Sequence, residues 1–151
     1  MVARKATHAD VPALLGMGRA MHAESPRFSP LHYSDSKVVE LAQHLLASPD
    51  KGGILVAEHE GKIEGMLSFL VAEYFFGNDR FASDLCVYVT PEYRGGSAFF
   101  RLLVAFEAWA TDLCVQELIL GTSTGVGQAN TVRALERLGY KQFSTGLLKR
   151  V

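Results

Sequence analysis

A pair of glycines at the junction of a strand pattern and a helix pattern is the feature of this sequence best suited to chemistry. The run Arg94-Gly95-Gly96-Ser97-Ala98-Phe99-Phe100 follows the apolar segment Val87–Val89 and the break at Thr90-Pro91. Glycines let the chain fold tightly with no Cβ in the way, and the next helix presents its first unpaired N–H groups with the positive end of its dipole. This arrangement predicts an anion site suited to a diphosphate, to which Arg94 can add charge or a forked hydrogen bond.

The spacing of the glycines excludes two common nucleotide-binding loops. No Gly-Lys-Ser/Thr follows, so the turn is not a Walker loop, and no Gly-x-Gly-x-x-Gly is present for a dinucleotide fold. By spacing alone two interpretations stay open. The turn binds an anion, or it only reverses the chain beside a solvated Arg94.

The same turn resembles the pyrophosphate-binding motif of the GNAT N-acetyltransferase superfamily, Gln/Arg-x-x-Gly-x-Gly/Ala after a strand that ends in Val-x-Pro. Arg94 stands at the first position, Ser97 at the first motif glycine and Phe99 at the second. Serine keeps its backbone N–H, whereas phenylalanine crowds the approach of the phosphates. The segment 133–140, Arg-Ala-Leu-Glu-Arg-Leu-Gly-Tyr, looks like the late helix of the same family.

Hydrophobic period and turn residues place these motifs on an ordered set of elements. They predict strands over residues 2–6, 53–58, 62–76, 81–89 and 117–120, helices over 10–22, 35–47, 98–111 and 130–138, and a final hairpin around 144–146. This order resembles the GNAT fold over essentially the whole chain. It implies an α+β (mixed α/β) GNAT-type acyl-CoA N-acyltransferase fold, with a central, mostly antiparallel twisted sheet of six to seven strands and about four flanking helices. We expect one domain over residues 1–151.

The resemblance also implies an acyl donor, acetyl-CoA, and the residues that would hold it. The strand before the motif would run along the pantetheine arm, the turn would surround the pyrophosphate, and a polar residue early in the late helix would contact the cofactor. The implied cofactor-binding residues are Val87, Tyr88, Val89, Arg94, Gly95, Gly96, Ser97, Ala98, Phe99, Phe100, Gln128 and Asn130. For Asn130 helix capping is an equally good interpretation.

Acyl transfer to an amine needs a base for the ammonium and a proton for the leaving thiolate. Many GNAT enzymes carry a tyrosine in the late helix for the second task, and here that position is Leu135. The catalytic candidates are therefore Asp84, Glu73 and Tyr88, because carboxylates in apolar strands often have a raised pKa. Each can also be an edge or solvent-facing polar residue.

The acceptor is expected to be a primary amine of a small molecule or a protein. The irregular segment His22–Phe28 would form one wall of its site, with Glu24 and Arg27 as substrate-binding candidates. An exposed loop capped by Ser25 is the alternative for this segment.

Bulk properties narrow the remaining classes of function. With a formal net charge of −1, the protein has no broad positive potential that would attract nucleic acid or an anionic membrane. No apolar segment is long enough to span a bilayer, and no signal-peptide core follows Met1, so we expect a cytoplasmic protein without membrane association. Cys86 and Cys114 belong to no metal-binding pattern, the histidines are scattered, and no metal is expected.

Two further interpretations remain beside the enzyme. Leu135, Ser97 and Phe99 are compatible with an acyl-CoA-binding sensor or subunit that has lost catalysis, and a scaffold that binds no cofactor is a third. The aromatic residues of the segment 66–76 favour a homodimer, although core packing explains them as well.

Overall fold

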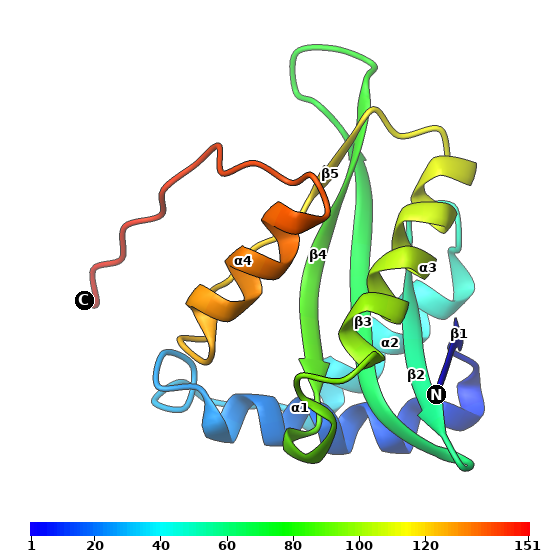
Figure 1. Ribbon diagram of the computed structural model, residues 1–151, viewed down its shortest axis with the longest axis vertical. Coiled ribbons are helices and arrows are strands. Elements are labelled where there is room, and N and C mark those ends of the chain that lie inside the picture. The colour runs from blue at the N-terminus through cyan, green and yellow to red at the C-terminus, as the bar shows by residue number, and fades with distance from the viewer.

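A mixed α+β architecture is seen in the computed structural model, which describes residues 1–151. The elements in chain order are β1 (Val2–Lys5), the 3-10 turn η1 (His8–Asp10), α1 (Val11–Glu24), α2 (Asp35–Ala47), β2 (Gly52–His59), β3 (Lys62–Glu73), β4 (Arg80–Val89), the 3-10 turn η2 (Pro91–Tyr93), α3 (Ala98–Asp112), β5 (Glu117–Ile119) and α4 (Gln128–Arg137). In Figure 1, α3 crosses one face of the sheet, α1 and α2 lie behind the other, and α4 lies beside β5.

The five strands form one sheet in chain order, β1-β2-β3-β4-β5. The first four are antiparallel neighbours, and β5 runs parallel to β4. This parallel pairing is short, because only Phe81–Ser83 of β4 face β5. Beyond Ser83, β4 has no strand on that side.

A hydrophobic cluster covers each face of the sheet. The larger one lies under α3 and contains Phe69, Phe106 and Trp109, whose rings meet edge to face. The smaller one joins α1 and α2 to β2, β3 and β4. Gly53 lets the Trp109 ring come close to the sheet, since a Cβ at this residue would lie 2.2 Å from a ring carbon.

The predicted closing hairpin is wrong, and the sheet has five strands instead of six to seven. Residues 138–151 form no strand, and in Figure 1 they run outward past α4. Two short strands are not stable without a third to pair with, and β5 offers an edge of only three residues.

The strand predicted over 62–76 also ends earlier, at Glu73. Tyr74 stacks on Phe76 beyond the strand, and Phe75 and Phe76 are exposed at the tip of the β3–β4 connection. Phe69 belongs instead to the core. A homodimer through this segment stays a prediction.

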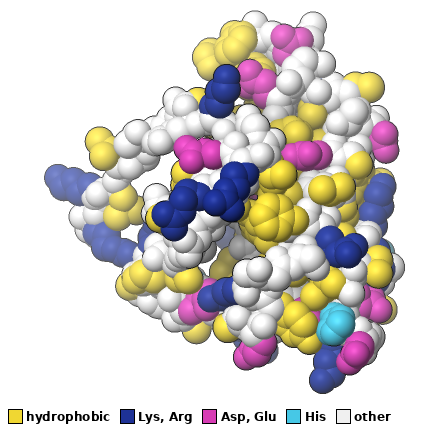
Figure 2. Space-filling view, viewed as in Figure 1, with side chains coloured by type: hydrophobic (Ala, Val, Ile, Leu, Met, Phe, Trp, Pro, Cys, Tyr) yellow, Lys and Arg dark blue, Asp and Glu magenta, His cyan; other side chains and the backbone are white.

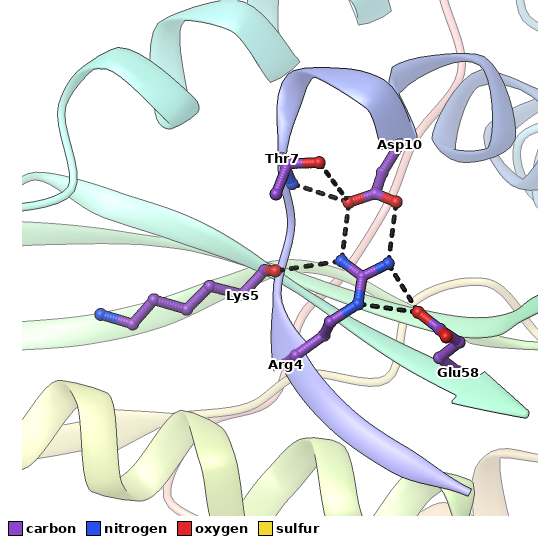
Figure 3. Close-up of polar contacts among 5 residues, drawn as sticks. All are labelled: Arg4, Lys5, Thr7, Asp10 and Glu58. Atoms are coloured by element: carbon purple, nitrogen blue, oxygen red, sulfur yellow. Dashed lines mark hydrogen bonds and ion pairs between the residues drawn. The ribbon is translucent and has the colours of Figure 1, made fainter. Parts of the chain in front are cut away.

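The first strand is tied to the start of α1 by a buried carboxylate. Asp10 directly precedes α1, and its side chain turns back to accept bonds from both terminal nitrogens of the Arg4 guanidinium, at 2.8 and 3.0 Å (Figure 3). The Thr7 amide donates to the same carboxylate, and Glu58 of β2 accepts from the other side of Arg4. The Arg4 side chain therefore holds the pKa of Asp10 down to about 2.

Asp10→Asn is expected to destabilise the protein at neutral pH. The lowering of the Asp10 pKa from 3.8 to about 2 corresponds to about 2–3 kcal/mol. Because the folded pKa lies below the unfolded value, this stabilisation is present above about pH 4 and is lost as the pH falls towards about 2. Urea unfolding of wild type and variant at several pH values measures it.

Asp50→Asn is the matched control, because it removes the same charge from a turn where only the backbone oxygen is bonded. Equal effects of the two substitutions, or a wild-type advantage that persists unchanged at acid pH, would contradict the role given to Asp10.

Candidate functional site

The separation of β4 from β5 opens a cavity beside the sheet. Residues 84–89 of β4 form one wall of it, and residues 120–124 after β5 form the opposite wall. The cavity measures about 440 Å³. It continues to the turn before α3 at one end, and it is bordered by the last turn of α1 and the first turns of α4.

A bulge in β4 shapes this wall. Ser68 pairs with Cys86 and Phe69 with Asp84, which leaves Leu85 as an extra residue. A bulge reverses the alternation of a strand, so Ala82 packs under α3 whereas Cys86 and Tyr88 pack towards α1. Beyond the bulge, residues of both faces border the cavity.

The turn before α3 has the properties predicted for an anion site. Gly95 has a φ of 79°, which favours a residue without a Cβ. The helix is 15 residues long, and its first amides have no carbonyl four residues earlier to bond. The Ser97 hydroxyl accepts a bond from Nε of Arg101, so a second guanidinium lies beside this turn.

Arg94 is held by three neighbours on the α1 side of the turn. Its Nε donates to the Val89 carbonyl at 2.9 Å, and its Nη2 lies 2.7 Å from a carboxylate oxygen of Glu24. The guanidinium also lies over the Tyr88 ring. Glu24, considered above as a partner for an ammonium, is thus already paired with a cation.

Ser25 joins the end of α1 to the loop after β5, and sequence reasoning gave it only a capping role. Its side chain is fully buried, its hydroxyl donates to the Thr124 carbonyl at 2.6 Å, and the Phe28 amide donates to it at 3.1 Å. The pair is separated by 99 residues in the chain. A serine just after a helix gives no local signal of such a bond.

Asp84 is a carboxylate of the cavity with no cation beside it. It accepts a hydrogen bond from the Gly121 amide at 2.9 Å, across the gap between β4 and the loop after β5. Desolvation by burial raises its pKa, and the bond from Gly121 opposes this only in part. Burial likewise raises the pKa of the neighbouring Cys86 thiol, which lies 3.1 Å from the Ser68 hydroxyl.

The structure brings most of the predicted site residues to this cavity. Those that border it are Glu24, Asp84, Val87, Tyr88, Val89, Arg94, Gly95, Gly96, Phe99, Phe100 and Asn130. Ser97 and Ala98 border a neighbouring hollow that shares Arg94, Gly95 and Gly96. Leu135 is buried and faces the cavity with no polar group to offer.

Three other predicted residues line neither the cavity nor the neighbouring hollow. Glu73 pairs with Arg80 at the far end of the β3–β4 ladder, because antiparallel pairing places it near the connection and away from residues 84–89. Arg27 bonds the Ser123 carbonyl, and its neighbour Phe28 lines the cavity instead. Gln128 begins α4, one turn before Thr131, which does line it.

Most of the loop after β5 borders the cavity but was not predicted from the sequence to belong to the site. Residues 121–124, 126 and 127 all border the cavity, together with Leu85 and Cys86. The run of small residues in this loop was the available signal.

No group of three or more His, Cys, Asp or Glu side chains is arranged to hold a metal ion. None of the helices has both the length and the apolar character needed to cross a membrane.

Comparison with known families identifies the fold and the class of the protein. The model of the acetyltransferase (GNAT) family matches residues 19–140. The chain belongs to this family. It is therefore an acyltransferase by family, and the turn at Arg94 lies inside the matched segment of this GNAT protein. No curated protein sequence matches the chain.

Solved structures share the fold of this GNAT protein over nearly its whole length. The aminoglycoside N-acetyltransferase AAC(6')-Iy, in complex with the bisubstrate analogue CoA-S-monomethyl-acetylneamine, has a TM-score of 0.79 at 16% identity, covering 99% of this chain and 96% of that one. A transcriptional regulator from Bacillus halodurans C-125 has a TM-score of 0.79 at 19% identity, covering 99% of both chains.

The apo aminoglycoside 6'-N-acetyltransferase AAC(6')-IG from Acinetobacter haemolyticus has a TM-score of 0.75 at 17% identity, covering 100% of this chain and 98% of that one. At such identities the likeness is one of fold.

Ser25→Ala is expected to loosen the wall of the cavity in this GNAT protein. The substitution leaves the Thr124 carbonyl and the Phe28 amide without their partner, which costs about 1–3 kcal/mol for buried polar groups. Thermal and urea unfolding measure the loss. Ser29→Ala is the control, because no side-chain bond is formed by that exposed serine. An unchanged stability of Ser25→Ala would show that the bond to the loop after β5 is not needed.

Proposed function

We propose that this protein is an N-acetyltransferase that moves an acetyl group from acetyl-CoA to a primary amine. The observation that carries the proposal is the continuity of one cavity from the helix-start anion site at Gly95 and Gly96 to the carboxylate of Asp84. An acyl donor with a diphosphate at one end and a thioester at the other needs both features in a single channel.

The anion site supports the donor end of this proposal. The first amides of α3 and the positive end of its dipole favour a diphosphate, and Arg101 adds a charge at the same turn. Phe99 and Phe100 line the cavity and can cover the donor with apolar surface. The unpaired edge of β4 beyond Ser83 offers backbone groups to the extended pantetheine arm.

Asp84 is proposed as the general base. Its pKa is raised by burial, which brings the carboxylate closer to the range in which it can take a proton from an ammonium near neutral pH. The freed amine nitrogen then attacks the thioester carbonyl, the C–N bond forms and the C–S bond breaks. The departing thiolate takes up a proton, and Tyr88, which borders the same cavity, is the candidate donor.

The direct test is to mix the purified protein with acetyl-CoA and a panel of primary amines and to follow free thiol. Turnover with at least one amine is expected, together with a thermal shift on addition of CoA. A shift without thiol release for any amine would favour the sensor that Leu135, Ser97 and Phe99 suggested. Absence of both would exclude the transferase and the sensor together.

Asp84→Asn is expected to lower kcat/KM by about a hundredfold or more, the usual contribution of a positioned base, while CoA binding is kept. In the wild type, kcat should rise with pH as Asp84 ionises, and the variant should lack this rise. Glu73→Gln is the matched comparison, since it neutralises the other candidate carboxylate, which lies outside the cavity. A larger loss for Glu73→Gln, or an unchanged pH profile for Asp84→Asn, would remove Asp84 as the base.

A further inference from the structure

The charge of the cavity restricts the kind of amine it can accept. Resting on the acetyl transfer proposed above, we propose that the acceptor is a compact monoamine, one ammonium on an apolar or aromatic body, and that polycationic amines of the aminoglycoside type are excluded. The acceptor side of the cavity lies between the end of α1, the bulged part of β4 and the loop after β5.

The cavity has few carboxylates to pair with an ammonium. Among the residues that line the cavity, only Glu24 and Asp84 are acidic. Glu24 is neutralised by Arg94 at 2.7 Å. Asp84 alone is then free of a cationic partner, so the site can compensate one ammonium. Each further ammonium brought into the cavity would lose water without gaining a counter-charge, which is costly.

The α1 and β4 walls on the acceptor side of the cavity are largely apolar. Met21 and Phe28 come from the α1 side, and Leu85, Cys86 and Tyr88 come from β4. These two walls bind alkyl and aryl groups by the hydrophobic effect. The polar lining of the acceptor side comes from the loop after β5, where Thr122, Ser123 and Thr124 border the cavity without adding a charge. The cavity measures about 440 Å³ and must also hold the thioester end of the donor, so the space left for the acceptor is small.

The C-terminal part of the chain, next to the cavity, is rich in basic side chains. Residues 128–151 include five basic side chains, Arg133, Arg137, Lys141, Lys149 and Arg150, and one acidic side chain, Glu136. Figure 2 shows Lys and Arg side chains over α4 and the C-terminal segment, next to a hollow. Arg150 also bonds the carbonyl of Arg27, whose own side chain bonds Ser123 of the loop after β5. This basic rim repels a multiply charged cation more strongly than a singly charged one.

The test compares phenethylamine with kanamycin in two separate readouts. Calorimetry on protein saturated with CoA measures amine binding, and thiol release from acetyl-CoA measures transfer. We expect phenethylamine to bind at least about tenfold more tightly, which corresponds to about 1.4 kcal/mol, and to be acetylated preferentially. Equal binding, tighter binding of kanamycin, or no binding of phenethylamine would overturn the inference whatever the turnover.

The two proposals can fail separately in this design. Selective binding of phenethylamine without thiol release from any amine counts against acetyl transfer and leaves the selectivity of the cavity supported. Acetylation of kanamycin in preference to phenethylamine supports transfer and overturns the monoamine inference.

Two substitutions tie the selectivity to named side chains. Met21→Glu adds a second carboxylate to the acceptor wall and should shift the ratio of affinities towards kanamycin by about tenfold. Phe28→Ala should weaken the binding of phenethylamine while the affinity for CoA stays the same. Phe75→Ser, at the exposed tip of the β3–β4 connection, is the control and should change neither. An unchanged ratio in a folded, CoA-binding Met21→Glu protein would overturn the placement of the acceptor.

Discussion

The structure depends on one constraint, that β4 and β5 pair over three residues and then part. The two walls of the cavity follow from the unpaired edge that this leaves between Ser83 and the end of β4. The bulge at Leu85 bends the strand at the same place and turns Cys86 and Tyr88 towards α1. An unpaired strand edge is normally a liability, because its backbone groups lack partners. Here the parted strands form the walls of a cavity instead.

Long-range polar contacts keep the parted strands at a defined separation. Asp84 bonds Gly121 across the gap, and Ser25 bonds Thr124 from the other side. Few water molecules compete for these hydrogen bonds, because Ser25 is fully buried and Asp84 is partly buried. The pair of Glu24 with Arg94 links the end of α1 to the turn before α3 in the same way. The two ends of the cavity, at the turn before α3 and at the bulge of β4, are therefore both tied to the end of α1.

Electrostatics divides the cavity into two regions of different character. At the start of α3, amide hydrogens and Arg101 make the surface favourable for an anion. Near the bulge, the one carboxylate without a cation, Asp84, has its pKa raised by burial in a largely apolar environment. Such a gradient suits a reaction in which a negatively charged donor enters from one end and an amine must lose its proton at the other. Membership of the GNAT family agrees with this division, although the family alone does not specify the amine.

Local physics was enough to predict most elements, and the turn before α3, from the sequence. The second helix begins and ends at the predicted Asp35 and Ala47, and the turn from Arg94 to Phe100 lies at the start of a long helix as expected. These features depend on hydrophobic periodicity, helix capping and glycine content, which are all set by residues close together in the sequence.

Only the tertiary structure decided which of the predicted residues meet. Glu73 was a candidate equal to Asp84 until strand register placed it at the far end of the ladder. The pairing of Glu24 with Arg94, and of Ser25 with Thr124, joins residues 70 and 99 positions apart. The prediction of a closing hairpin was wrong for the same reason. A strand needs the free edge of another strand to pair with, and its own residues do not show whether such an edge is present. Contacts of this range depend on how elements pack together, and no local pattern in the chain carries that information.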